Sequence, residues 1–509
     1  MRIHDYLDYW ARRQPDALAV SDGRESLTWR QLSARSTQLA EWLSARLEVG
    51  ARFAVLSKNS LDLLALYYAA SRAQVVPVPL NVRLAPPEWA YILQDAGARL
   101  LLSEADFAAG LATIREGLLD AAPRDADPAL GWAKVDVIAR PGNVADSPTP
   151  GALYQMYTSG TTGLPKGVVV TQESACSNIV QLQTSLQLRQ DRALIVMPLF
   201  HAGAVISAFT YLASGTSCYI MRDFEPAAVL STFRQARISV VLLVPAMIQM
   251  LLDHPDLDSS PYDDLALMTY GGAPISTKLL RRAMAAFGCD FLQGYGMTET
   301  TSVATILDRE DHALAAESRA DLLLSCGRPA VGTEVRIVGG DGAELPIGQT
   351  GEVVLRGPQL MQAYWNRADA TAAALQSGWL RTGDAGHLDE AGYLFLTDRV
   401  KDMIVSGGEN IYPREIEEVL RRLEDVSDVA VIGIPDDRWG EVPLAFIVAQ
   451  PAATLTAKQV VQHCRAWLAG FKCPRTVVFV EELPRNATGK VLKRELRAPY
   501  WDEAGRQVS

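Results

Sequence analysis

Apolar and polar residues alternate along the N-terminal part of this chain in a way that predicts strands and helices in turn. Short apolar runs, typical of buried strands, lie at 51–56, 75–80 and 99–102. Before and between them, apolar residues recur at helical spacing over 27–48, 60–73 and 86–96. Strands that alternate with helices predict an α/β fold with layers built on parallel sheets.

The same alternation resumes after residues 141–151, a stretch rich in Pro and Gly whose composition predicts a linker. Further strands are expected at 152–157, 168–170, 193–197, 240–244 and 267–270. From about residue 327 the apolar segments become shorter and Gly-containing turns separate them, as between 334–338 and 352–356. This pattern predicts antiparallel strands in a small barrel-like β subdomain.

The pattern changes once more at 398–402, where mostly charged residues stand between two apolar strands. Beyond this point we expect helices over 414–423 and 457–469 and strands over 428–434 and 442–449. The residues after 402 are numerous enough for one small α+β domain. We therefore expect a large N-terminal domain over 1–398 and a small C-terminal domain over 403–509.

The overall composition argues against several classes of partner and site. The 509 residues carry a net charge of −11, which argues against nucleic acid or an anionic membrane as the main partner. The six cysteines stand singly, without a C-x-x-C pair, so neither a structural zinc site nor a disulfide framework is indicated. Reduced thiols fit a cytoplasmic protein. No apolar run approaches the ~18–20 residues of a transmembrane helix.

The N-terminal residues have one apolar helix face, formed by Ile3, Tyr6, Leu7 and Trp10. Such a face can lie on a membrane surface or dock on the protein's own domain. Because two aspartates share the segment, docking is favoured. We therefore expect peripheral membrane contact at most.

One loop carries the strongest chemical signal. The segment Tyr157–Gly167 lies between two predicted strands and is rich in Gly, Ser and Thr. Glycines let the backbone curl around an anion, and Lys166 adds a positive charge. The loop is not a Walker A motif, because Lys166 is followed by Gly167 rather than by Ser or Thr. It predicts a phosphate site that comprises Thr158, Ser159, Gly160, Thr161, Thr162 and Lys166.

Further motifs, in order along the chain, resemble those of the adenylate-forming enzymes, the superfamily of acyl-CoA synthetases, beetle luciferases and peptide-synthetase adenylation domains. They are Pro198–His201, Gly271–Pro274, Gln293–Thr300, Gly378–Asp384, Ser406–Pro413 and Pro484–Lys490. The resemblance extends over nearly the whole chain and is strongest to the acyl-CoA synthetase group. It implies an enzyme that uses ATP, Mg²⁺ and CoA.

The resemblance also implies roles for single residues. In adenylation a carboxylate attacks the α-phosphate of ATP, so the site needs cations and oriented N–H donors. Glu299 is the expected Mg²⁺ ligand, Asp384 the acceptor for the ribose hydroxyls, and Lys490 the lysine between carboxylate and α-phosphate. His201 is expected near the acyl carbonyl, and Thr158 near the phosphates. The other expected nucleotide-binding residues are Gly272, Ala273, Pro274, Gly294, Tyr295, Gly296, Thr298, Arg399 and Lys401.

The second half-reaction separates the members of this superfamily. By resemblance CoA is the acceptor, since Gly407 and Gly408 leave room for pantetheine and Trp439 lies near its tunnel. Cys473 stands where some relatives have a basic residue, which weakens the contact with the CoA nucleotide or moves it to Lys472, Arg475 or Arg83. Two alternatives stay open: transfer to a separate carrier protein, and a catalytically silent nucleotide-binding homologue.

The acid is less well specified. The pocket positions implied by the resemblance are apolar or small: Val205, Ala208, Gly271, Gly272, Tyr295 and Val303. They favour an apolar acid, a fatty acid above all, with aromatic and alicyclic acids still open. Gln293 and Gly294 stand where malonate-activating relatives have an arginine, so a dicarboxylate is not expected.

The resemblance finally implies a hinge over 399–402, around which the small domain rotates between the two half-reactions. The expected partners are therefore small molecules: a carboxylic acid, ATP and CoA. No nucleic acid is expected, and a homodimer is left open.

Overall fold

A computed structural model describes most of the chain. The described residues are 1–114, 149–158, 164–188, 191–257, 262–399, 402–406, 409–436, 438–451, 453–485 and 491–502, with two short strands at 124–125 and 133–136. At 124–125, 133–136, 398–399, 405, 409–410 and 502 only the backbone is described. The predicted linker therefore lies largely outside the described residues.

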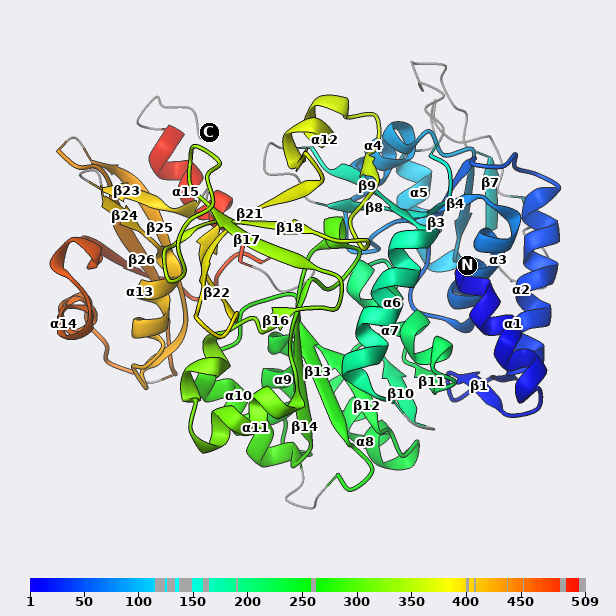
Figure 1. The fold of residues 1–509 in the computed structure, drawn as a ribbon, viewed down its shortest axis with the longest axis horizontal. Helices are drawn as coiled ribbons and strands as arrows, with labels where there is room; N and C mark the ends of the chain where they lie inside the picture. Colours follow the sequence, from blue (N-terminus) through cyan, green and yellow to red (C-terminus); the bar gives the residue numbers. More distant parts are fainter. Residues whose placement is uncertain are drawn as a thin grey trace.

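A nine-stranded sheet forms the centre of the larger part of the molecule (Figure 1). Its strand order is β16-β15-β14-β13-β12-β10-β11-β1-β2. The six strands from β14 to β1 are parallel to their neighbours, whereas β2, β15 and β16 pair antiparallel at the edges. The strands are β1 (Leu18–Ser21), β2 (Ser26–Thr28), β10 (Arg192–Ile195), β11 (Ser217–Ile220), β12 (Val240–Leu243), β13 (Leu267–Gly271), β14 (Asp290–Tyr295), β15 (Thr305–Leu307) and β16 (Arg328–Pro329).

A second sheet has the order β4-β3-β5-β7-β6 and is parallel from β4 to β5. Its strands are β3 (Arg52–Leu56), β4 (Val76–Pro79), β5 (Leu100–Ser103), β6 (Arg124–Asp125) and β7 (Ala133–Asp136). The parallel α/β layers predicted from the sequence are thus confirmed.

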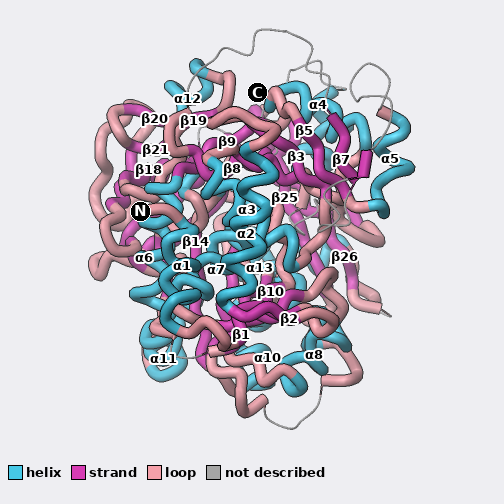
Figure 2. The backbone as a smooth tube through the Cα atoms, turned by 90° about the vertical axis from the view of Figure 1, so that its right-hand side faces the viewer, coloured by secondary structure: helices cyan, strands magenta, loops and turns pink. Residues whose placement is uncertain are grey.

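Helices fill the space between these two sheets and cover their outer faces, giving five layers (Figure 2). On β3, Phe53 and Val55 pack toward the inner helices, whereas Ala54 and Leu56 pack toward the outer ones. The inner helices are α1 (Ile3–Arg13), α2 (Trp29–Ser44), α3 (Leu61–Ala73), α6 (Gln172–Leu186) and α7 (Ala202–Ala213). The outer helices are α4 (Pro86–Ala96) and α5 (Ala108–Thr113) on one side, and α8 (Pro226–Gln235), α9 (Pro245–Leu252), α10 (Thr277–Phe287) and α11 (Arg309–Glu317) on the other.

Local sequence signals explain where these helices begin and end. The α4 helix matches its predicted bounds because Pro86 is tolerated in its first turn and Gly97 ends it in a left-handed conformation. The helix predicted over 27–48 is shorter in the structure. Thr28 closes strand β2, and its side-chain oxygen caps α2 by accepting a hydrogen bond from the Gln31 amide.

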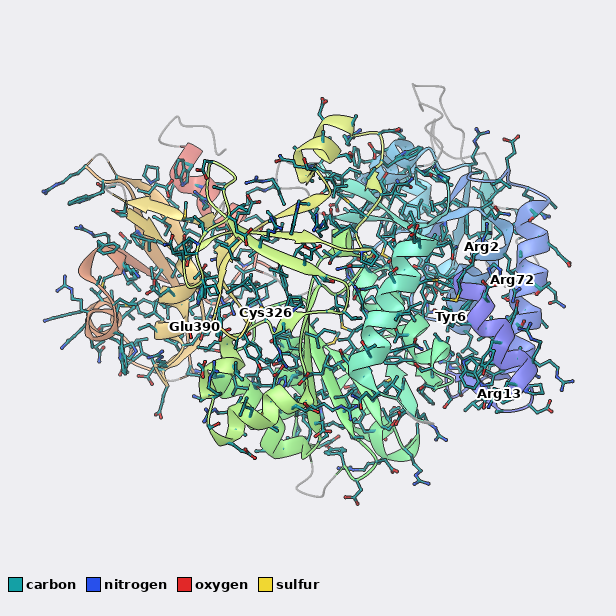
Figure 3. The ribbon with its side chains drawn as sticks, viewed as in Figure 1. Arg2, Tyr6, Arg13, Arg72, Cys326 and Glu390 are labelled. Carbon is teal, nitrogen blue, oxygen red and sulfur yellow. The ribbon has the colours of Figure 1, made fainter. Side chains whose placement is uncertain are left out.

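The N-terminal helix α1 docks on its own domain, as expected. Ile3 and Leu7 are buried in the inner helical layer, and the Trp10 indole donates a 3.0 Å hydrogen bond to the Ala213 carbonyl. Figure 3 shows Arg2, Tyr6 and Arg13 along this segment, with Arg72 of α3 close to it. Among the described residues, no helix has both the length and the apolar character needed to cross a bilayer.

Two antiparallel sheets lie beside the layered part. The hairpin β8 (Ala152–Thr158) and β9 (Lys166–Thr171) pairs with β19 (Ala363–Tyr364). The second sheet has the order β17-β18-β21-β20, with β22 also pairing β21, and is the antiparallel subdomain predicted after residue 327. Among the described residues, its strands pair in this open order and do not close into a barrel. It comprises β17 (Glu334–Val338), β18 (Gly351–Arg356), β20 (Leu375–Gln376), β21 (Trp379–Leu388) and β22 (Leu394–Arg399), and helix α12 (Ala368–Ala374) packs nearby.

The C-terminal residues form a fifth sheet, of order β24-β23-β26-β25 with β27 parallel to β26, covered by helices (Figure 1). The Arg414 guanidinium of α13 donates a hydrogen bond to the Leu396 carbonyl of β22, so this part contacts the antiparallel subdomain. The elements are β23 (Ile404–Ser406), β24 (Glu409–Ile411), α13 (Pro413–Leu420), β25 (Val426–Asp436), β26 (Gly440–Ala449), α14 (Ala457–Trp467), β27 (Thr476–Phe479) and α15 (Lys493–Asp502).

Candidate active site

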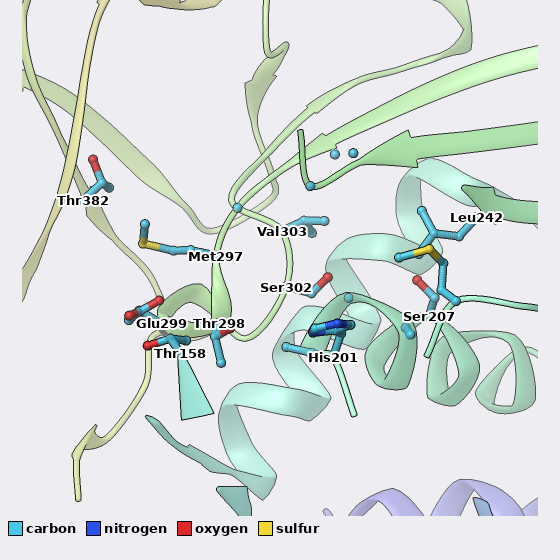
Figure 4. A pocket seen from close by; sticks show the side chains of 18 of the residues that line it. Thr158, His201, Ser207, Leu242, Met297, Thr298, Glu299, Ser302, Val303 and Thr382 are labelled. Atoms are coloured by element: carbon cyan, nitrogen blue, oxygen red, sulfur yellow. The ribbon is translucent and has the colours of Figure 1, made fainter. Parts of the chain in front are cut away.

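One cavity of about 760 Å³ lies where the nine-stranded sheet, the β8–β9 hairpin and the antiparallel subdomain meet. Figure 4 shows Thr158, Thr298 and Glu299 at one end, Ser207 and Leu242 at the other, and His201 between them. The sequence-predicted site residues that line it are Thr158, Lys166, His201, Gly272, Gly294, Gly296, Thr298 and Glu299. The fold therefore brings together residues that are far apart in the chain.

The β8–β9 hairpin presents the predicted phosphate loop to this cavity. Thr158 and Lys166 are cross-strand partners, so they close the loop between them, and both line the cavity. Ser159, Gly160, Thr161 and Thr162 lie outside the described residues. The Lys166 ammonium stands 5.1 Å from the ring centroid of Tyr364, which leaves it near the cavity wall.

A partly buried polar network holds the base of this hairpin. The Asp95 carboxylate accepts a 2.7 Å hydrogen bond from the Tyr157 hydroxyl and pairs at 2.5 Å with the Arg367 guanidinium. The Trp365 indole donates to the Asp95 carbonyl at 3.1 Å. Asp95 thus joins α4, the end of strand β8 and the segment after β19.

Glu299 lies in a short turn after β14 and is almost fully buried. Its Oε1 atom accepts a 2.8 Å hydrogen bond from the Tyr364 hydroxyl, and its main-chain carbonyl accepts from the Met361 amide. Sequence reasoning did not identify Tyr364 as a functional residue, yet it contacts both Glu299 and Lys166. One tyrosine ring thus separates the predicted metal ligand from the predicted phosphate-binding lysine.

The site can be tested for the expected Mg²⁺. Among the described residues, no group of three His, Cys, Asp or Glu side chains could hold a metal ion. A cation bound here must therefore take most of its ligands from phosphate oxygens and water, which is how Mg²⁺ commonly binds in nucleotide sites. The Glu299 carboxylate, which lines the cavity beside Thr158 and Lys166, fits that arrangement.

The predicted adenine residues lie at the ends of the adjacent strands β13 and β14, whereas the predicted ribose residue Asp384 lies within β21 of the antiparallel subdomain. Gly272 has a φ of +75°, and a Cβ on Gly296 would stand 1.9 Å from the Ser302 carbonyl oxygen, so both turns require glycine. The Tyr295 hydroxyl donates a 2.7 Å hydrogen bond to the Asp384 carboxylate. Neither side chain is among the cavity-lining residues, but Thr382 and Gly383, just before Asp384, are.

For the other residues that were predicted to bind the nucleotide, the structure describes fewer contacts. Ala273 and Pro274 continue the turn after Gly272 outside the cavity lining. Arg399 is the cross-strand partner of Asp384 in the β21–β22 ladder, although its side chain lies outside the described residues. Lys401 lies outside them as well.

His201 precedes helix α7 and lines the middle of the cavity. Its Nε2 atom is buried and has no hydrogen-bond partner among the described residues. Burial, with a smaller contribution from the Arg83 charge, lowers the pKa of His201 to about 4. A neutral imidazole with an unused nitrogen facing a cavity is suited to hydrogen-bond a ligand rather than to attract it by charge.

This pKa leads to a prediction about pH dependence. Because the folded-state pKa lies below the ordinary value of 6.5, we expect no His201-dependent change in adenylation rate between about pH 6 and 8. A His201→Gln variant should be slower but should keep the shape of the pH–rate profile. The wild type should also lose stability relative to this variant as the pH falls from about 6.5 toward 4. A wild-type inflection near pH 6.5 that disappears in the variant would refute the neutral-ring assignment.

The lining of the cavity differs in part from the acyl pocket expected from the sequence. Gly271, Gly272 and Val303 line the cavity, but Val205, Ala208 and Tyr295 do not. Val205 and Ala208 are fully buried on a neighbouring face of α7. The α7 residues that line the cavity are Ala202, Gly203, Ala204, Ser207 and Tyr211. The last three are spaced by three and four and mark a single helix face. The remaining wall contains Thr269, Tyr270 and Ser302 and a larger set of apolar residues, Leu182, Leu186, Met197, Leu242 and Leu292.

The predicted CoA-binding segments are neighbours in the C-terminal sheet. Ser406, directly before Gly407, pairs with Gly440, directly after Trp439. Gly407 and Gly408 lie outside the described residues, whereas Trp439 is 37% exposed beneath the Arg438 guanidinium. Strand pairing thus joins the residue before the glycine motif to the residue after an exposed aromatic side chain.

The basic segment near Cys473 offers fewer charged side chains to the CoA nucleotide than the sequence suggested. Cys473 is buried in the core of the C-terminal sheet, and the Lys472 ammonium pairs with Glu415 at 2.7 Å. Lys490 lies outside the described residues, but its loop is closed by a bridge between Arg485 and Val491. The loop that carries Lys490 therefore has both ends fixed to this domain.

Comparisons with known proteins agree with this geometry. The family "AMP-binding enzyme" matches residues 7–365, and "AMP-binding enzyme C-terminal domain" matches residues 415–490. A fatty acid–acyl-carrier-protein ligase, ScoC, of Streptomyces coeruleorubidus is 38% identical over 98% of this chain and 97% of its own. The long-chain-fatty-acid–CoA ligase FadD13 of Mycobacterium tuberculosis is 37% identical over 93% of each chain.

A solved structure gives the same result. The o-succinylbenzoate CoA synthetase (MenE) of Bacillus subtilis, in complex with its acyl-adenylate intermediate OSB-AMP, has a TM-score of 0.82 and 30% identity, covering 96% of this chain and 97% of its own. The fold and the cavity thus define a nucleotide-dependent enzyme of the adenylate-forming, acid–thiol ligase class. The chain belongs to the AMP-binding enzyme family.

Proposed function

We propose that the protein is an acyl-CoA synthetase that converts an apolar carboxylic acid, ATP and CoA into acyl-CoA, AMP and pyrophosphate. The observation that carries this proposal is the two-ended cavity, with Thr158, Lys166 and Glu299 at one end and apolar side chains at the other. A nucleotide and an acid bound in these two ends would meet near His201. The first half-reaction joins them as acyl-AMP.

Each residue of the phosphate end has a proposed task in adenylation. Lys166 and the loop after Thr158 bind the β- and γ-phosphates that leave as pyrophosphate. Glu299 holds Mg²⁺, which when bound offsets the charge of the phosphates. Tyr364 orients the Glu299 carboxylate through its hydrogen bond. His201 donates a hydrogen bond to the acid carboxylate and keeps it in line for attack on the α-phosphorus.

The adenosine end uses the turns of the nine-stranded sheet and the antiparallel subdomain. The cavity-lining glycines Gly272, Gly294 and Gly296 allow close approach of the adenine ring, and Ala273 and Pro274 continue the turn after Gly272. Tyr295 and Asp384 lie next to each other, and Asp384 accepts the ribose hydroxyls. We propose that Arg399, the cross-strand partner of Asp384, contacts the same nucleotide.

We propose that two arrangements of the C-terminal domain serve the two half-reactions. In the first, Lys490 reaches the α-phosphate. In the second, the face with Gly407, Gly408 and Trp439 receives pantetheine. The segment 399–402 is the hinge between the domains over 1–398 and 403–509. The pairing of Ser406 with Gly440 supports the second arrangement, because Ser406 directly precedes the glycines in the chain and Gly440 directly follows Trp439.

The hinge gives a prediction. Proline fixes φ near −65°, so Lys401→Pro should restrict rotation and uncouple the two half-reactions. We expect acid-dependent pyrophosphate release to be retained and thioester formation to be lost. Lys401→Ala, which removes the side chain without fixing φ, should retain both. Equal and mild effects of the proline variant on both half-reactions would show that the hinge lies elsewhere.

Transfer to a carrier protein is the second candidate. It is favoured by the ion pair that occupies Lys472 and by the burial of Cys473, which leave fewer charges for the CoA nucleotide. The relative ScoC is a ligase for acyl-carrier protein, whereas FadD13 is a CoA ligase. A catalytically silent homologue is disfavoured, because Lys166, Glu299 and Asp384 are all present at the site.

The acceptor experiment supplies the enzyme with ATP, Mg²⁺ and a panel of fatty and arylalkanoic acids. Thioester is then measured with either free CoA or phosphopantetheinylated acyl-carrier protein. The proposal predicts acyl-CoA formation at low CoA concentration and much slower loading of the carrier protein. Efficient loading of the carrier with no acyl-CoA would favour the second candidate, and no adenylation with any acid would refute both.

A further inference from the structure

One residue beside the phosphate end of the cavity has a strained backbone. Thr301 has φ +65° and ψ −52°, and the Ser302 amide donates a 2.7 Å hydrogen bond to the Thr300 carbonyl across it. These values define a γ-turn of the rare, strained kind. Six non-glycine residues of the described chain have a positive φ, and Thr301 is the β-branched one among them. Glycine would adopt this conformation without strain, so the threonine needs a separate explanation.

The turn separates two parts of the cavity wall. Glu299 precedes it and lines the phosphate end, whereas Ser302 and Val303 follow it on the side of His201 (Figure 4). Thr301 itself is fully buried and is not among the residues that line the cavity. Its conformation therefore sets the position of the Glu299 carboxylate relative to Ser302.

A buried carbonyl holds the Thr301 side chain. The Thr301 hydroxyl donates a 2.6 Å hydrogen bond to the Gln359 carbonyl. The Gln359 side chain donates to the Thr333 hydroxyl at 2.7 Å, and its amide oxygen lies 3.2 Å from the Gln181 Nε2 atom. The same Nε2 atom donates to the Val331 carbonyl at 2.8 Å. Gln181 and Gln359 are at most 2% exposed, so water does not compete for these hydrogen bonds.

A second contact holds the chain just after the turn. Asn178 of helix α6 accepts a 3.1 Å hydrogen bond from the Val303 amide and donates one of 2.9 Å to the Val303 carbonyl. It also donates to the Gln181 Oε1 atom at 2.7 Å. Asn178, Gln181 and Gln359 thus form one amide network. A rare backbone conformation persists when the surrounding structure over-determines it, as this amide network does.

The amide network also connects the turn with other parts of the phosphate end. Helix α6 begins directly after strand β9, whose first residue is Lys166. Gln359 and Met361 lie just before β19, which carries Tyr364, and the Met361 amide donates to the Glu299 carbonyl at 2.8 Å. Because the anchors of the turn lie on elements that also carry residues of the phosphate end, they place Glu299 relative to those residues.

We propose that Thr301 is a positioning residue for adenylation. Its strained turn, held by the amide network, fixes the nucleotide site at Glu299 relative to the acid site at His201. A small displacement between two bound reactants slows their reaction strongly even when each of them still binds. The inference rests on the proposed function, because it needs the nucleotide and the acid to meet in this cavity. It explains why a threonine, with a hydroxyl that can be held, stands in a turn that glycine would adopt more easily.

The test compares two substitutions at this position, with an acid that the wild type activates. Thr301→Gly removes the hydroxyl but adopts the turn without strain, so it should unfold close to the wild-type temperature. It should lower kcat of acid-dependent pyrophosphate release about tenfold, with little change in KM for ATP or for the acid. Thioester formation from supplied acyl-AMP should survive, because the two reactants are then already joined. Thr301→Ser keeps the hydroxyl and should keep most of the activity.

The control is Gln74→Gly, which places a glycine at another position of positive φ, exposed at the end of α3 and outside the cavity wall. It should change neither half-reaction. A wild-type kcat in Thr301→Gly, or equal losses in the glycine and serine variants, would overturn the inference. An equal loss of both half-reactions, or a loss of activity that follows a loss of folded protein, would overturn it as well by showing a merely structural role. All of these results would leave the proposed function standing, whereas a wild type that adenylates no acid would remove both.

Discussion

Replacement of Lys490 by alanine is expected to lower acid-dependent adenylation by ~10²–10³. Two anions, the acid carboxylate and the α-phosphate, must approach each other, and a lysine between them offsets the charge that builds up in the transition state. Arg485 and Val491, the described residues on either side of the Lys490 segment, form a backbone bridge within the C-terminal domain that does not involve the Lys490 side chain. The domain itself should therefore fold normally in the variant.

The role of Lys490 is separated from general damage by the second half-reaction. Thioester formation from supplied acyl-AMP and CoA should survive the substitution much better than adenylation does. Lys458→Ala, a change at an exposed lysine on helix α14 of the same domain, should leave both steps unaffected. An equal loss of both steps in Lys490→Ala would show that the lysine has a structural role or a different chemical one.

The second large effect is expected for Glu299→Gln, which keeps the shape of the side chain and removes its charge. The carboxylate lies beside Thr158 and Lys166 and is the group at the phosphate end best suited to a hard cation. We expect at least ~10-fold slower adenylation at limiting Mg²⁺, partly recovered at high Mg²⁺. Calorimetric titration should show weaker binding of Mg²⁺·ATP with little change for ATP in chelator.

Tyr364→Phe is the matched control for that experiment, because it removes only the hydrogen bond to Glu299. It should shift the Mg²⁺ requirement in the same direction by a smaller factor. If the Mg²⁺ titration of Glu299→Gln superimposes on that of the wild type, Glu299 is not the metal ligand.

Where residues at both ends of a helix favour its start and its stop, the first and last residues of the helix could both be predicted from the sequence. Pro86 and Gly97 bound α4, and the predicted and observed bounds agree. The helix expected over 27–48 was too long, because Leu27 and Thr28 belong to a short edge strand. Apolar spacing alone does not distinguish such a strand from the first turn of the helix that follows it.

The parts of the site that depend on packing could not be predicted in the same way. Motif resemblance pointed to Glu299 but not to Tyr364, a partner 65 residues away that only the pairing of β19 with β9 brings near. It also placed Val205 and Ala208 in the acyl pocket, whereas the structure turns the Ala204–Ser207–Tyr211 face of α7 inward. The rotation of a helix that is apolar all round is set by its neighbours rather than by its own pattern.

A rapid-quench measurement of one turnover tests the central claim most directly. Enzyme in excess over a preferred acid is mixed with ATP and Mg²⁺, and CoA is added after a delay. The account predicts one pyrophosphate per acid before CoA is added, with acyl-AMP retained on the enzyme, and release of AMP and acyl-CoA only afterwards. Pyrophosphate release that required CoA, or AMP release without any acyl-CoA, would contradict a two-step acyl-CoA synthetase.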